Sequence, residues 1–222
     1  MVVAAEASPR FPQRGKSPPG ERPPASVPPV RKVLPENRFT SVLQRVIDLA
    51  TLACGWWLLA LSAITCLEIL GRKFFGFSLQ GVDEIGSYTF AIVTGFGFSY
   101  ALICAGHTRV DFLMARFPPR GRAVLNAFAM VTLAAMAAFA AYRAGHVLAD
   151  SRALVSTAPT PLATPLWWPQ SIWFAAYALF ALATGYAAGH ACLLLGKRQW
   201  RLLNSRYGPQ TLEEEIAAEA PK

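Results

Sequence analysis

The amino-acid sequence predicts an all-α integral membrane protein with four transmembrane helices, preceded by an amphipathic interfacial helix. Hydrophobic residues make up 54% of the 222 residues and charged residues only 15%, against about 45–50% and 25% in soluble domains. The charges gather in the two tails and in short clusters between long apolar runs. Basic residues beside membrane spans also explain the net charge of +8, which therefore does not indicate a nucleic-acid partner.

Residues 1–36 are predicted to be a disordered, proline-rich basic tail. Nine of the 17 prolines lie in residues 1–35, and such a segment buries too little apolar surface to offset the entropy lost on ordering. It has no early apolar core of the kind found in signal peptides, so we expect no cleavage.

The four-helix membrane domain is predicted over residues 37–198. Apolar residues recur at helical spacing from Phe39 to Ala50, which indicates the amphipathic helix, and the first span follows at about 49–67. Trp56 and Trp57 lie near the middle of this span, whereas tryptophans usually gather at the membrane surface. We expect them to pack against other helices; a substrate contact is the alternative.

A short, glycine-punctuated connection over residues 68–81 is predicted to join the first two spans. Glu68 and Arg72 lie one helical turn apart in it and are expected to pair. The second span, about 85–105, is opened by Asp83 and Glu84 and closed by a cluster of three polar residues, His107, Arg109 and Asp111. Glu84 and His107 are about 34 Å apart at the helical rise, enough to cross a hydrocarbon core of about 30 Å.

The third and fourth spans are predicted at about 123–142 and 169–195, with a polar cytoplasmic tail at 199–222. The third span is rich in alanine, and small side chains allow helices to approach closely in a membrane. In the fourth span, Pro169 suits a first helical turn. Ala181, Gly185 and Gly189 form a ridge of small residues that predicts a second packing face.

The distribution of lysine and arginine predicts that both termini are cytoplasmic. If the two tails and the middle loop share one side of the membrane, that side carries 17 basic residues against 4 on the other. Cytoplasmic segments carry the excess of basic residues.

No pattern in the sequence indicates an enzyme or a bound cofactor. It has no GxxxxGK[ST] loop, Gly-x-Ser-x-Gly elbow or HExxH pair, and helix packing explains Gly95 and Gly97 better than a nucleotide loop does. The four cysteines lie in or beside apolar runs and form no CxxC pair, which favours ordinary apolar packing over disulfides or a metal site.

Histidines leave one alternative open. His107 and His190 are predicted to lie near the same membrane face, where two such residues can ligate a haem b. Ordinary interfacial hydrogen bonding is the interpretation that we favour. His107 and Asp111 can also form a metal pair, but no third ligand is evident.

The spans hold almost no ionisable residues, whereas a transporter with its own pathway needs polar groups or broken helices at mid-depth. This pattern indicates a partner subunit. The other interpretation, a self-contained small transporter, would require uptake by this chain alone in liposomes.

Several motifs, in order, resemble a known family. Residues 68–78 (EILGRKFFGFS) precede the acidic pair Asp83–Glu84, the HTRVD motif at 107–111 closes the second span, and residues 160–169 (TPLATPLWWP) precede the last. Over residues 42–198 this sequence resembles the small membrane subunit (DctQ-like) of tripartite ATP-independent periplasmic (TRAP) transporters. It departs from the family at Ser87, where a basic residue is frequent, and at 103–105, which are apolar where arginine is frequent.

The resemblance implies a scaffold subunit in the bacterial inner membrane, beside a large membrane transport subunit (DctM-like). A sodium gradient would drive uptake, and a periplasmic solute-binding protein would deliver an organic acid. A haem-b membrane anchor of a redox enzyme is the alternative hypothesis. Residues expected to make subunit or structural contacts are Glu68, Arg72, Asp83, Glu84, His107, Arg109, Asp111, Trp56, Trp57, Gly185 and Gly189.

Overall fold

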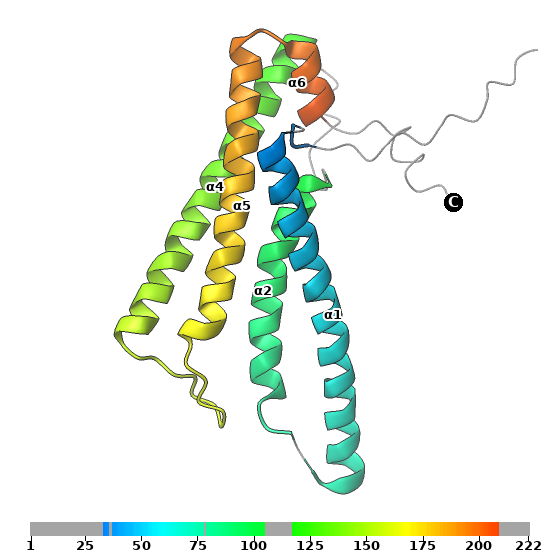
Figure 1. Ribbon diagram of the computed structural model, residues 1–222, viewed down its shortest axis with the longest axis vertical. Helices are drawn as coiled ribbons and strands as arrows, with labels where there is room; N and C mark the ends of the chain where they lie inside the picture. The colour runs from blue at the N-terminus through cyan, green and yellow to red at the C-terminus, as the bar shows by residue number, and fades with distance from the viewer. Residues whose placement is uncertain (1–32, 36, 78, 105–116, 209–222) are drawn as a thin grey trace, which may run out of the picture. The chain divides into compact units, whose positions relative to one another are not determined.

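The computed structural model describes residues 33–35, 37–77, 79–104 and 117–208 of the chain. All of them belong to one compact unit, Val30–Gln210. Its elements are the helices α1 (Arg38–Phe75), α2 (Val82–Ile103), α4 (Pro119–Ala153), α5 (Trp167–Gly196) and α6 (Trp200–Tyr207) (Figure 1). The first four are long and apolar enough to cross a membrane, which confirms the predicted all-α fold with four membrane-spanning helices.

Consecutive long helices run in opposite directions, so this unit has two ends of different composition. The start of α1, the end of α2, the start of α4, the end of α5 and all of α6 lie at one end, and the connections after α1 and after α4 lie at the other. This arrangement is the one that the charge count requires. That the first end faces the cytoplasm remains a prediction.

Two of the long helices extend well beyond the predicted spans. Helix α1 has 38 residues, or about 57 Å at the helical rise. The amphipathic segment predicted ahead of the first span forms its first turns, without a break between them. Helix α4 continues from the predicted end at Tyr142 to Ala153.

The core lies mainly between α4 and α5, where small side chains meet. On α5, Ala176, Ala183, Ala187 and Ala191 are fully buried, and the facing side of α4 contributes a similar row: Ala123, Ala127, Met130, Ala137 and Ala144. Alanine side chains let the two helix backbones approach closely, as predicted for the third span. Only one face of that span takes part, because Ala135 and Ala138 are exposed.

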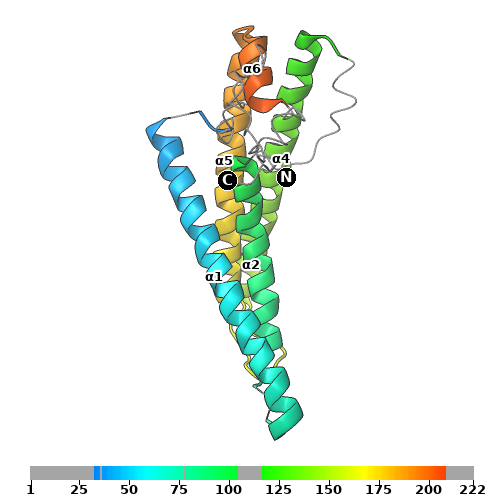
Figure 2. The same cartoon turned by 90° about the vertical axis from the view of Figure 1, so that its right-hand side faces the viewer.

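Helix α1 lies alongside α2 (Figure 2) and contributes few residues to the core. Leu43 and Ile47, in its first turns, are buried in the same cluster as Leu102 and Ile103 of α2. The amide of Asn37 also donates a hydrogen bond of 2.8 Å to the hydroxyl of Tyr186 on α5. The start of α1 is therefore attached to the bundle, while its apolar 18-residue window is not buried within the described residues.

Two segments predicted as tails contribute to the packed unit. Val33 and Leu34, near the end of the predicted disordered tail, are buried; residues 1–32 lie outside the described residues. At the other terminus, residues predicted as part of a polar tail form α6, whose Leu203 and Tyr207 are buried.

Candidate functional site

An apolar groove of about 720 Å³ lies between α1, α2 and the start of α5. Helix α2 contributes Ile92, Val93 and Phe96, and the first turn of α5 contributes Trp167 and Trp168. Trp57 of α1 also lines it, and its indole N–H donates a hydrogen bond of 2.8 Å to the hydroxyl of Thr89 on α2. A groove of this composition can hold an apolar side chain or an acyl chain but offers little to a charged substrate.

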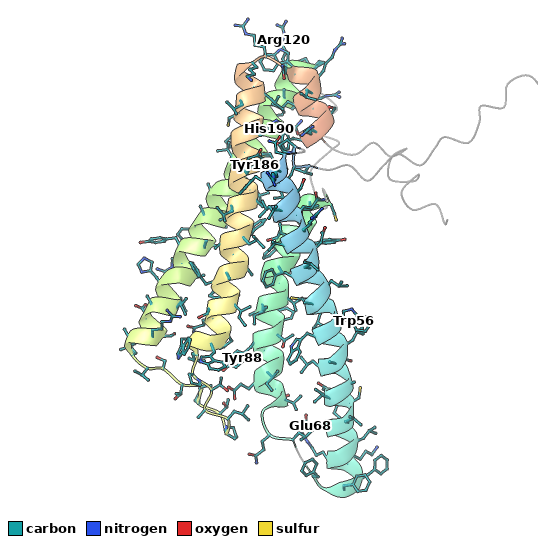
Figure 3. All side chains as sticks on the ribbon, viewed as in Figure 1. Trp56, Glu68, Tyr88, Arg120, Tyr186 and His190 are labelled. Carbon is teal, nitrogen blue, oxygen red and sulfur yellow. The ribbon has the colours of Figure 1, made fainter. Side chains whose placement is uncertain are left out.

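The two tryptophans of the first span therefore lie on different faces of α1. Trp56 is 68% exposed and borders a second groove, of about 730 Å³, with Asp48, Thr51 and Tyr100 (Figure 3). Trp57 makes the contact with another helix that was expected of both residues.

Glu84 attaches the α4–α5 connection to the start of α2. Its side chain is 8% exposed. One carboxylate oxygen accepts a hydrogen bond of 2.9 Å from the hydroxyl of Tyr88, one turn further along α2. The other accepts a hydrogen bond from the hydroxyl of Thr160, in the connection. Asp83, its neighbour, is exposed, so the two carboxylates of the acidic pair have different surroundings.

A close approach at Gly81 reinforces this attachment. Gly81 has a φ of 98°, a left-handed conformation that favours glycine. A Cβ placed there would lie 2.2 Å from a terminal carbon of Leu162, in the same connection. No larger side chain fits without moving that leucine.

Glu68 and Arg72 form the ion pair that their spacing predicts. The carboxylate of Glu68 is buried, at 4% exposure, while the guanidinium of Arg72 is mostly exposed. Both residues lie near the end of α1, at the same end of the helices as Glu84.

The glycine ridge of α5 does not pack within this part of the chain. Gly185 and Gly189 are exposed, and a Cβ added to either would have no neighbour within 4 Å. Within the described unit, α5 instead uses its alanine face. The ridge remains a candidate surface for another subunit.

Three predicted site residues, His107, Arg109 and Asp111, lie outside the described residues. The Nδ1 atom of His190 lies 2.9 Å from the hydroxyl oxygen of Tyr207 on α6, the kind of local contact expected of an interfacial histidine. No group of three potential metal-ligating side chains comes together in the ranges that the structure describes.

Sequence reasoning missed Thr160 and Tyr207 as partners. Thr160 belongs to the threonine- and proline-rich connection, but no pattern linked it to Glu84, which is 76 residues away. Tyr88, by contrast, lies four residues after Glu84, and that spacing alone indicates a possible contact.

Comparison with known families identifies one match. The family described as "Tripartite ATP-independent periplasmic transporters, DctQ component" matches residues 61–192. No curated protein and no solved structure gave a match. The matched region includes the last part of the first span, all of the second and third, and most of the fourth. It gives the haem hypothesis no support. Because it covers more than half of the sequence, the chain belongs to the DctQ family of tripartite ATP-independent periplasmic transporter components.

Proposed function

We propose that this chain is the small scaffold subunit of a TRAP-type transporter in the bacterial inner membrane. It braces a larger, DctM-like membrane subunit, which carries the transport pathway. Uptake of an organic acid, delivered by a periplasmic solute-binding protein, is driven by an ion gradient. Family membership supports the assignment of this chain as a component of a transporter. The scaffold role is inferred from the sequence and the helix packing of this chain.

The observation that carries the scaffold role is the exposed apolar surface of α1. None of its apolar 18-residue window is buried within the described residues, whereas 22%, 28% and 39% of the corresponding windows of α2, α4 and α5 are buried. A membrane helix with so little packing inside its own chain has a whole side available for another membrane subunit.

The interior of the spans supports a role without a pathway. Residues 49–67, 85–103, 123–142 and 169–189 contain no Asp, Glu, Lys, Arg or His. Transporters place such residues, or interrupted helices, where substrate and ions bind. Each described span is also a continuous helix in those ranges.

Reconstitution into liposomes tests the proposal. This chain, a DctM-like large subunit from the same organism, or both together are reconstituted, and a periplasmic binding protein of the same system, loaded with its acid, is added outside. We expect uptake of the radiolabelled acid under a sodium gradient only when both membrane subunits are present. Uptake by this chain alone, or full uptake by the large subunit alone, would contradict the scaffold role.

The glycine ridge offers a sharper test of subunit contact. Substituting Gly185→Leu and Gly189→Leu adds bulk at positions where a Cβ would have no neighbour within 4 Å in the described unit. We expect the double variant to fold but to recover much less of the large subunit in a detergent pull-down. Gly97→Leu, on α2, also adds a side chain where a Cβ would have no neighbour within 4 Å and serves as the control for added bulk on a second helix. Equal recovery with wild type and double variant would remove the ridge from the interface.

A further inference from the structure

Basic side chains dominate the end of the unit where α4 begins, α5 ends and α6 lies. We call this set the basic end: Arg120, Arg122, Lys197, Arg198, Arg201 and Arg206. Between Phe117 and Gly208 the sole acidic residue is Asp150, near the opposite end of α4. Figure 3 labels Arg120 and His190 at this end of the helices. The described part of the basic end therefore carries positive charge with no carboxylate among its own residues.

Helix α6 is fixed in place by polar contacts with both neighbouring helices. The side-chain amide of Asn204 donates a hydrogen bond of 2.8 Å to the carbonyl oxygen of Pro119. Its oxygen accepts one of 3.0 Å from Asn126 of α4. The hydroxyl of Tyr207 contacts His190 of α5 at 2.9 Å. The cations of α6 are thus held against the ends of α4 and α5 rather than on a free tail.

The faces of α6 differ in the way expected of a helix at a membrane surface. Leu203 and Tyr207 are buried against the bundle, while Arg201 and Leu202 are exposed and Trp200 is half-buried. Helices that lie in the interface combine basic residues with exposed leucine and tryptophan in this manner. This arrangement places the apolar side chains of α6 beside its charges.

Arg122 already donates a hydrogen bond of 2.9 Å from its Nε atom to the carbonyl oxygen of Phe117, so the binding capacity for an anionic ligand lies with the other cations of the basic end. Arg120, Lys197, Arg198 and Arg201 are exposed. Arg206 is half-buried, and its Nη1 atom is buried without a hydrogen-bond partner among the described residues. A guanidinium binds phosphate oxygens through several N–H groups in fixed geometry, so phosphate suits such a surface well.

We propose that the basic end binds the phosphate headgroups of anionic lipids at the membrane surface. The lipid phosphates neutralise the cations, while Trp200 and Leu202 contact the upper part of the acyl chains. Basic residues near an anionic leaflet each add to the attraction, which weakens as salt screens it. This binding would fix the depth and orientation of the α4–α5 pair in the bilayer independently of any transport partner.

Lipid binding by the purified chain tests the proposal. The full-length protein in a non-ionic detergent is titrated with phosphatidylglycerol or with phosphatidylcholine, and bound lipid is counted by native mass spectrometry. The test variant carries Lys197→Gln, Arg198→Gln and Arg201→Gln. The control variant removes three exposed cations elsewhere, through Lys73→Gln, Arg143→Gln and Arg152→Gln.

We expect phosphatidylglycerol to bind on the order of tenfold more weakly to the test variant than to wild type or control, since each cation contributes to the attraction. Phosphatidylcholine should bind all three proteins alike. In wild type, raising the salt concentration should remove the preference for phosphatidylglycerol, which keeps the test valid if the test variant folds poorly.

Equal loss of phosphatidylglycerol in the test and control variants would overturn the proposal, as would a preference in wild type that salt does not change. The sequence also contains glutamates at 213–215 and 219, whose carboxylates are the alternative to lipid phosphates as the anions that neutralise the basic end. If they neutralise the basic end, the test variant will bind phosphatidylglycerol as wild type does, and that result also overturns the proposal.

Discussion

The contact between Gly95 of α2 and Ala176 of α5 offers the most direct test of how the helices pack. Gly95 is buried, and a Cβ added to it would lie 2.9 Å from the Cβ of Ala176. Carbon atoms in contact prefer about 3.5–4.0 Å, so Gly95→Ala requires the helices to separate by roughly 0.6–1.1 Å. Overpacking of this kind costs about 1–3 kcal/mol of unfolding free energy.

A matched glycine isolates this steric cost from helix propensity. Gly97 lies two residues away on the same helix, and a Cβ there would have no neighbour within 4 Å. Replacing glycine by alanine favours a helix by up to about 1 kcal/mol at either position. The unfolding free energy of Gly95→Ala should therefore be lower than that of Gly97→Ala by about 1–3 kcal/mol.

The assay is unfolding of the detergent-purified protein by sodium dodecyl sulfate, followed by far-UV circular dichroism. Ala176→Gly removes the clashing methyl group, so it should rescue Gly95→Ala. In a double-mutant cycle the coupling energy should be about 1–3 kcal/mol in the direction of rescue. Equal stability of Gly95→Ala and Gly97→Ala, together with no coupling to Ala176→Gly, would refute the close approach of α2 and α5.

Three further predictions concern single polar contacts. Trp57→Phe loses the hydrogen bond to Thr89 on α2. It should therefore lower the unfolding free energy by about 0.6 kcal/mol, and by at most about 1.7 kcal/mol. Trp56→Phe, at an exposed position, should leave the unfolding free energy nearly unchanged. Glu84→Gln should accelerate hydrogen exchange in residues 154–166, because a charged acceptor is lost, whereas Asp83→Asn should not; equal exchange in both would contradict the attachment. Burial raises the pKa of Tyr207, so the unfolded state loses this proton first as pH rises. The unfolding free energy should then fall above about pH 10, by about 1.4 kcal/mol per pH unit, and Tyr207→Phe should reduce that slope.

Span positions could be predicted because a long uncharged run is a strong signal, whereas the helix ends depend on weaker ones. Residues 143–153 contain Arg143, Asp150 and Arg152 but no proline. Their one glycine, Gly145, is tolerated inside a helix, so α4 continues past the apolar run. Helix α6 has only 8 residues and is stabilised by its contacts with α4 and α5. A sequence shows such contacts poorly, because helices of this length are marginal on their own.

The sequence also did not allow us to predict which face of α5 is buried. Glycines at 185 and 189 and alanines at 183, 187 and 191 are all small, and each set recurs every four residues. Both patterns satisfy the rule for close helix packing, yet in the described unit the alanines are buried and the glycines exposed. Which set is buried depends on the α4 surface that α5 meets, and this information is distributed along another helix.

In the candidate site, contacts between residues close in the sequence could be predicted, whereas contacts between distant residues could not. Glu68 and Arg72 are four residues apart in one helix, so their pairing follows from helix geometry. The contact between Glu84 and Thr160 depends on the path of a connection that enters α5 from α4. No periodic pattern encodes that path, so the partner of Glu84 became evident only in three dimensions.

The distribution of these contacts indicates which helix depends most on a second subunit. The α4–α5 pair has a continuous alanine interface, and α2 joins α5 where Gly95 meets Ala176. Helix α1 is attached chiefly by its first turns and by Trp57, while its apolar window stays exposed. A partner that binds only the folded arrangement adds its binding free energy to the stability of the element that it covers. If the proposed large subunit covers α1, complex formation should therefore slow hydrogen exchange more in α1 than in α4 or α5.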